Sequence, residues 1–357
     1  MSLHAVDDLE EAFEATKAFL LPFQWGRWLR LAIVAFFVAG ASGSFPTTGT
    51  NFSFDGGTVD GGDVTFPADL GPVTIADSGE LLALVLAVVG VIVALALLLG
   101  FVGSVMEFVL IRSLREEEVH VRRYFGDHWG AGLRLFGFRL GIGLLAFALV
   151  VGPVLALLFA TGGPAAIDGP GAVFGLVLLA VPLALVFGTL FVLIDGFTTF
   201  FVVPVMLVEN RAVLSAWRRF WGVLRAEWKE YLVFVVLTAV LTLVAGTAVG
   251  FVVGIVGLVL VGPVVVAGIA GAITGSPVVL AVVAVIGAGA VLAVLFVAAF
   301  VRVPVVTYFR YYALLVLGDT ESDLDAIPER RGRIRAAEAG SDGDRGASDD
   351  ASGAESA

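Results

Sequence analysis

Two carboxylates, Glu107 and Asp195, lie within long apolar stretches and are the first candidates for chemistry. Charged side chains inside membrane spans are costly, and they commonly mark proton relays, ion pathways or structural ion pairs. Along straight helices, Asp195 falls about 36 Å beyond Gly171, and Glu107 falls about 39 Å beyond Leu81. Both therefore reach the inner boundary of a hydrocarbon core about 30 Å thick. We expect Arg112 or the arginines of a surface helix to pair with them, although a proton or ion relay stays open.

Other groupings that could carry chemistry are weaker. His120 follows Glu116 and Glu117 at helical spacing, but no second motif of this kind completes a two-metal carboxylate site. The acidic run at 319–325 lacks the glycine of a calcium-binding loop. The chain has no cysteine, and it contains no P-loop, GxSxG or HExxH motif, so no cofactor or metal is predicted. The sequence disfavours an enzyme without excluding one.

The composition is that of a membrane protein. The chain of 357 residues is 59% hydrophobic, with a mean hydropathy of +1.00, and it is 15% charged, against about 25% in soluble domains. Its net charge of −11 argues against a nucleic-acid partner. Low lysine, many acids and absent cysteine suggest a salt-loving host. We predict an all-α polytopic bundle with six spans, at 28–45, 81–105, 135–160, 172–195, 232–260 and 278–301.

Positive charge orients this bundle. Basic residues are missing from 31–111, 140–210 and 230–301, so with six spans all of them fall on one side. Because positive charge marks the cytoplasmic side, both termini are predicted to lie in the cytoplasm, with the protein in the cell membrane. The predicted organisation is an amphipathic segment at 1–27, the six-span domain at 28–317 with an outer loop at 46–80 and inner surface helices at 113–130 and 210–229, and a disordered acidic tail at 318–357.

The stretch SAWRRFWGVLRAEWKEY, which begins at Ser215, combines arginines and tryptophans at helical spacing. Its tryptophans are expected on one face and its arginines on the other, with Asn210 as the N-cap. Such a helix should lie in the inner membrane interface. An earlier basic segment, where Ser113 and Glu116 form a capping-box pattern, completes a predicted headgroup belt. The belt consists of Arg115, Arg122, Arg123, Arg211, Arg218, Arg219, Arg225, Trp217, Trp221 and Trp228.

A weak internal repeat relates these basic segments. A shift of 96 positions superposes RRYFG at 122–126 on RRFWG at 218–222. The chain is therefore predicted to contain three pseudo-repeats, each a surface helix plus two spans. The apolar run from 172 to 208 is longer than a membrane requires, and Pro204 is expected to kink or end it.

Asn51 is a candidate glycosylation site. It begins the sequon Asn-Phe-Ser in the predicted outer loop, on the side where glycans are attached. The other asparagine, Asn210, is followed by Arg-Ala and forms no sequon.

Two stretches carry a family resemblance. FVVPVMLVENRAVLSAWRRFWGVLRAEWKEYLVF, from Phe201, and FRYYALLVLGDTESDLDAIPE, from Phe309, resemble a haloarchaeal family of multi-pass membrane proteins of unknown function. More distantly, the Pro–x–x–x–x–Glu stretch that leads into the Ala-Trp-Arg helix is similar to the membrane domain attached to some glycerophosphodiester phosphodiesterases. The resemblance is best over 200–330 and implies a membrane fold and setting. No catalytic phosphodiesterase motif accompanies it.

These observations favour a structural or lipid-interacting membrane protein whose belt engages anionic headgroups. The alternatives are a transporter or channel that uses Glu107 and Asp195, and a membrane-embedded enzyme. Membrane lipids are the predicted partners, and the oligomeric state is left open. A transport path requires both carboxylates to line one water-accessible cavity, whereas an anchoring role requires arginine partners.

Overall fold

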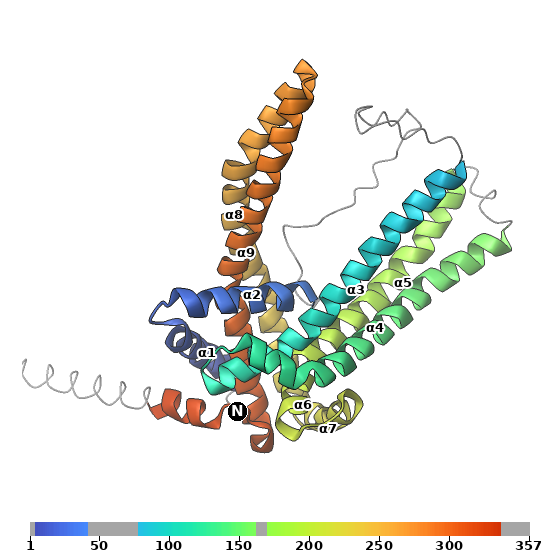
Figure 1. The fold of residues 1–357 in the computed structure, drawn as a ribbon. Coiled ribbons are helices and arrows are strands. Elements are labelled where there is room, and N and C mark those ends of the chain that lie inside the picture. Colours follow the sequence, from blue (N-terminus) through green and yellow to red (C-terminus); the bar gives the residue numbers. More distant parts are fainter. Residues whose placement is uncertain (1–3, 42–77, 162–169, 337–357) are drawn as a thin grey trace, which may run out of the picture.

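The computed structural model describes residues 4–41, 78–161 and 170–336 (Figure 1). These residues contain helices and no β-strand, so the predicted all-α class is confirmed. Five helical segments within them are long and apolar enough to cross a membrane. They are α3 (Ser78–Glu116), α4 (Val121–Ala160), α5 (Pro170–Phe197) continued by the π-helix η2 (Thr198–Val202) and α6 (Val203–Glu209), α8 (Trp228–Thr274), and α9 (Pro277–Thr320).

The long helices form two arms that diverge from a common base (Figure 1). α3, α4 and α5 make up the three-helix arm, and α8 and α9 pair as the two-helix arm. Apolar side chains cover the outer parts of both arms, and Leu144, Leu185 and Leu258 are among those that are exposed. A helix that is apolar all round requires apolar surroundings, so the surface of the arms is suited to lipid hydrocarbon.

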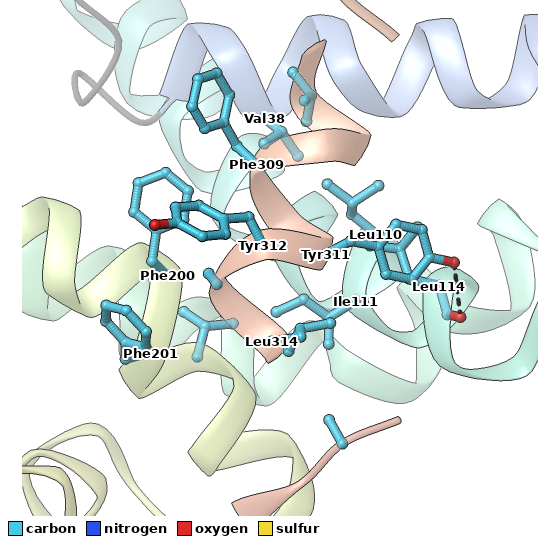
Figure 2. Close-up of a cluster of buried hydrophobic side chains, with 14 of the residues drawn as sticks. Val38, Leu110, Ile111, Leu114, Phe200, Phe201, Phe309, Tyr311, Tyr312 and Leu314 are labelled. Carbon is cyan, nitrogen blue, oxygen red and sulfur yellow. Dashed lines mark hydrogen bonds between the residues drawn. The ribbon is translucent and has the colours of Figure 1, made fainter. Parts of the chain in front are cut away.

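The buried core lies in the base, where short helices meet the converging ends of the arms. Figure 2 shows the inner part of α9 between Leu114 of α3, Phe201 of η2 and Val38 of α2 (Trp25–Ala41). The Tyr311 hydroxyl of α9 donates to the Leu114 carbonyl at 3.4 Å. Full burial of one large apolar side chain contributes about 1.5–3 kcal/mol, so this cluster is the main source of stability in the base.

The first predicted span, 28–45, differs from a spanning helix in its described part. α2 lies across α3 and α9 at the base and packs against both (Figure 1). Its 17 residues are fewer than the roughly 20 that cross a hydrocarbon core, and it is not one of the five spanning helices. Six spans are therefore not confirmed. One face of α2 is buried at Leu31 and Val34, and another is apolar but exposed, at Trp25, Leu29, Ile33 and Phe36.

Both ends of the described chain pack together at the base. α1 (His4–Leu20) lies against α9, and the Tyr312 hydroxyl donates to the Ala5 carbonyl at 2.7 Å. After α9 the chain continues through η3 (Ser322–Leu324) and a helical stretch at 328–336. We call residues 321–336 the C-terminal strap. Arg330 of the strap donates to the Ala15 carbonyl of α1 at 2.8 Å, which ties the two chain ends to each other.

The prediction of a disordered tail from residue 318 is thus wrong for the strap. Leu324, Ala326 and Ile327 are buried in the base. Arg331 Nη1 lies 3.0 Å from Asp319 Oδ1 and 3.3 Å from Asp325 Oδ2. Composition hides this order because three apolar residues, Leu324, Ala326 and Ile327, are enough to anchor the strap in the core, and its opposite charges pair with each other. Residues 337–357 lie outside the described part of the chain.

The predicted surface helix at 113–130 is not a separate element. α3 continues to Glu116, a short connection follows, and α4 begins at Val121. Ser113 lies inside α3, where its hydroxyl donates to the Val109 carbonyl at 2.7 Å, so its predicted capping role is wrong. In the later segment, by contrast, α7 (Val213–Ala226) and α8 are distinct helices. The two segments related by the 96-residue shift therefore differ in structure.

Candidate functional site

Four buried charges meet at the base. Arg139 of α4 lies between two carboxylates: its Nε is 2.9 Å from Asp195 Oδ1 of α5, and its Nη2 is 3.4 Å from Glu107 Oε1 of α3. Arg310 of α9 forms an ion pair with the other Glu107 oxygen. Arg139 also donates to the hydroxyl of Thr199 in η2. We call Glu107, Arg139, Asp195 and Arg310 the buried charge network; the most exposed of them, Arg139, is 8% exposed.

The π-helix η2 provides a backbone acceptor for this network. The Val203 N–H donates to the Thr198 carbonyl, and Pro204 has no N–H to donate. The Thr199 carbonyl is therefore left to a side chain, and Arg310 donates to it. Pro204 is predicted to kink or end the helix. In the structure, one widened turn precedes it, and the helix continues as α6. Such π-turns often occur at functional positions.

The buried charge network lies where the apolar arms meet the base. The outer stretches 81–106, 140–160, 171–194 and 278–301 carry no charged residue. At 1.5 Å per residue, each is long enough to cross a core about 30 Å thick. Removing one partner from a buried ion pair leaves an unbalanced charge and costs about 3–5 kcal/mol. The arrangement is suited to hold α3, α4, α5 and α9 in one relative position.

The partners of the two carboxylates differ from those expected. Arg112 lies 2.7 Å from Glu116 through its Nε and 3.4 Å from Asp127 through its Nη1, and these ion pairs involve neither Glu107 nor Asp195. Sequence reasoning missed Arg139 and Arg310, although both lie at the same depth along their helices as the carboxylates. Within residues 4–41, 78–161 and 170–336, no group of three His, Cys, Asp or Glu side chains could hold a metal ion.

Helix α7 carries a second candidate site on its outward side. Its inner side is buried against the base at Val213, Ala216, Phe220 and Val223. Four exposed residues follow one another at intervals of four, three and four positions, which places them on one face. We call them the α7 stripe: Leu214, Arg218, Trp221 and Arg225. The Arg225 guanidinium lies over the Trp221 ring, 5.1 Å from its centroid.

The predicted division of α7 into a tryptophan face and an arginine face is wrong. Trp221 shares the exposed stripe with Arg218 and Arg225, because the protein core takes the side that carries Phe220. Asn210 is also not the N-cap; it is the C-cap of α6 in the left-handed conformation, with φ +49°. Asparagine tolerates that conformation better than most residues.

A family model covers both candidate sites. The model described as a family of unknown function (DUF7544) matches residues 3–327, a range that includes the buried charge network and the α7 stripe. The chain belongs to this family. No curated protein and no solved structure matches the chain.

In this DUF7544 protein, the predicted belt arginines fall into two groups according to their partners. Arg211 Nε lies 2.9 Å from Glu209 Oε2, and Arg219 Nη2 lies 3.4 Å from Glu321 Oε1, so both have a carboxylate partner. The other belt arginines are exposed and form no ion pair with a described residue: Arg115, Arg122, Arg123, Arg218 and Arg225.

The belt tryptophans of the DUF7544 protein also differ in setting. Trp221 and Trp228 are exposed, whereas Trp217 is partly buried and donates through Nε1 to the Thr198 hydroxyl at 3.1 Å. Trp217 thus connects α7 to the π-turn that carries Thr199. The candidate glycosylation site, Asn51, lies outside the described residues.

Proposed function

We propose that this protein is a multi-pass protein of the cell membrane whose base lies at the inner leaflet and binds anionic lipid headgroups. One observation carries the proposal: exposed arginines that form no ion pair with a described residue belong to α7 and to the junction of α3 and α4, and these elements lie at the base, where the apolar arms end (Figure 1). Each basic residue near an anionic surface contributes about 1 kcal/mol to binding. Leu214 and Trp221 of the α7 stripe add side chains that insert at headgroup level.

The proposal includes six crossings with both termini in the cytoplasm. Five long segments run between the base and the far end, while α1 and the C-terminal strap both pack at the base. Five passages alone would leave the chain ends on opposite sides, so the proposal keeps the predicted first span at 28–45 as the sixth crossing. Asn51 then belongs to the predicted outer loop at 46–80. In this cysteine-free chain, Asn51→Cys should react with a membrane-impermeant maleimide on intact cells; labelling only after lysis would reverse the proposed orientation.

Native mass spectrometry of the full chain with phosphatidylglycerol or phosphatidylcholine tests headgroup binding. The wild-type protein should retain more of the anionic lipid, and Arg218→Gln/Arg225→Gln should retain less of it. The matched control is Arg211→Gln/Arg219→Gln, which removes the same charge from residues already paired with carboxylates. Equal retention of the two lipids, or equal loss in the two variants, would contradict the proposal.

A transporter that uses Glu107 and Asp195 has less support, because buried arginines hold both carboxylates. For a membrane-embedded enzyme, the described residues offer no group of three His, Cys, Asp or Glu side chains that could hold a catalytic metal ion. The salt-loving host and the likeness to the phosphodiesterase membrane domain stay predictions from sequence.

A further inference from the structure

Arg302 of α9 is a partly buried arginine that forms no ion pair or hydrogen bond with a described residue. It is the first charged residue after the stretch 278–301, which is long enough to cross the hydrocarbon core. Arg310, eight residues further along the same helix, has Glu107 and the Thr199 carbonyl as partners. An ionised group shielded from water needs an opposite charge, so Arg302 requires an anion that no described residue supplies.

The surface of α9 that leads outward from Arg302 is apolar. Val291, Leu295 and Ala298 precede Arg302 by eleven, seven and four residues, a spacing that places all four on one helix face. Val291 is 49% exposed and Leu295 is 44% exposed. An exposed apolar strip that ends in a cation at headgroup depth has the polarity of a phospholipid: an acyl chain fits the strip, and a phosphate fits the guanidinium.

Aromatic rings from α2 and α9 lie at the same level. The Phe300 ring centroid is 5.8 Å from that of Trp25, 6.4 Å from that of Trp28 and 4.7 Å from that of Phe296. Trp25 and Phe296 are exposed, and α2 lies across α9 here (Figure 1). Tryptophan side chains favour the boundary between acyl chains and headgroups. The rings therefore mark the depth at which a lipid phosphate would meet Arg302.

We propose that α9 forms a discrete site for one anionic phospholipid, with the phosphate on Arg302 and an acyl chain along Leu295 and Val291. The site rests on the proposed inner-leaflet position of the base, but it shares no residue with the α7 stripe. Salt screens a partly buried guanidinium less than it screens exposed arginines. This lipid should therefore remain bound at salt concentrations that release headgroups from the α7 stripe.

Native mass spectrometry after a wash at about 1 M salt, where the screening length falls to roughly 3 Å, isolates the site. The full-length wild-type protein should keep one phosphatidylglycerol molecule and should not keep phosphatidylcholine. Arg302→Gln should lose that lipid, and Arg302→Lys should keep it in part. Arg134→Gln, which removes an exposed arginine of α4 with no ion pair to a described residue, is the matched control and should behave as wild type.

Photolabelling with a phosphatidylglycerol that carries a diazirine in its acyl chain gives a second readout at the same salt concentration. Cross-links should concentrate at 291–298 in wild type. Arg302→Lys should give the same cross-links in lower yield, and this variant replaces Arg302→Gln in the test if the glutamine variant does not fold. Retention of the lipid by Arg302→Gln, or cross-links spread evenly over both arms, overturns the site. Equal binding at low salt by wild type and Arg218→Gln/Arg225→Gln overturns the α7 proposal instead, so the two failures are distinguishable.

Discussion

The Nε atom of Arg139 lies 2.9 Å from Oδ1 of Asp195, and both side chains are almost completely buried. This pair joins α4 to α5, and Glu107 and Arg310 extend the contact to α3 and α9. A buried ion pair is stabilising only as a unit, because either charge alone lacks compensation for its lost hydration.

Asp195→Asn should therefore lower the free energy of unfolding by about 3–5 kcal/mol, since it leaves Arg139 with too little opposite charge. Combining it with Arg139→Gln should cost less than the sum of the two single changes, because neither charge then remains alone. Thermal unfolding in detergent measures both effects, with Glu118→Gln, at an exposed carboxylate, as the control. Strict additivity of the two changes would contradict the role given to the pair.

Glu107→Gln should loosen the two arms relative to each other, because the Glu107–Arg310 ion pair joins α3 of one arm to α9 of the other. Cysteines introduced at the exposed positions Leu98 and Leu292 allow spin labelling of this cysteine-free chain. We expect a broader distance distribution between the labels in Glu107→Gln than in the otherwise wild-type protein. In the control variant Glu118→Gln, the distance distribution between the labels should be as narrow as in the otherwise wild-type protein. An equally narrow distribution in Glu107→Gln would mean that core packing alone holds the arms.

The sequence predicts those parts of the fold that depend on contacts between residues close together in the chain. The long apolar helices are predictable, because a run without charges is itself the signal for a spanning helix. The placement of α2 is not, because Leu31 and Val34 are buried against elements distant in sequence. Pro204 is visible in the sequence, but the donor to the neighbouring Thr199 carbonyl, Arg310, is 111 positions away.

The candidate sites follow the same rule. The depth of Glu107 and Asp195 follows from counting residues along a helix, whereas their pairing with Arg139 depends on how separate helices are rotated. On α7, the helical period is predictable, but the side that faces the protein is decided by Phe220 and its distant neighbours, such as Tyr231. Which arginines remain exposed could therefore not be predicted from spacing.

The stability of the base should fall as pH rises, through Asp8. Burial, then the neighbouring carboxylates of Asp319 and Glu11, raise the pKa of Asp8 from 3.8 to about 8, although Arg331 acts in the opposite direction. Between these two values the folded state binds more protons than the unfolded state, so the free energy of unfolding decreases with rising pH and levels off above about pH 8. Asp8→Asn should flatten this dependence in thermal unfolding measurements, whereas Asp7→Asn, at an exposed neighbour, should leave it intact.

Ile327→Ala should release the C-terminal strap. Truncation of a buried isoleucine costs about 2–5 kcal/mol, and Ile327 is 3% exposed. Since cleavage of a transiently opened segment follows its stability, limited trypsin digestion at Arg330 and Arg331 should accelerate at least about tenfold. Glu329→Ala, at an exposed position of the same segment, should be cut at the wild-type rate. Equal rates for the two variants would show that the strap is not held by its apolar contacts.

The contacts between α1 and the last part of the chain also impose an order on biosynthesis. α1 leaves the ribosome before the other described helices, yet Tyr312 and Arg330, which bind its carbonyl oxygens, lie 307 and 315 positions beyond their partners. The long helices α3 to α8 are therefore synthesised before α1 can make these contacts. A chain that terminates before the strap has complete arms and keeps the contact of Tyr312 with α1, but it lacks the hydrogen bond of Arg330 to Ala15, so the strap is the last described element to join the base.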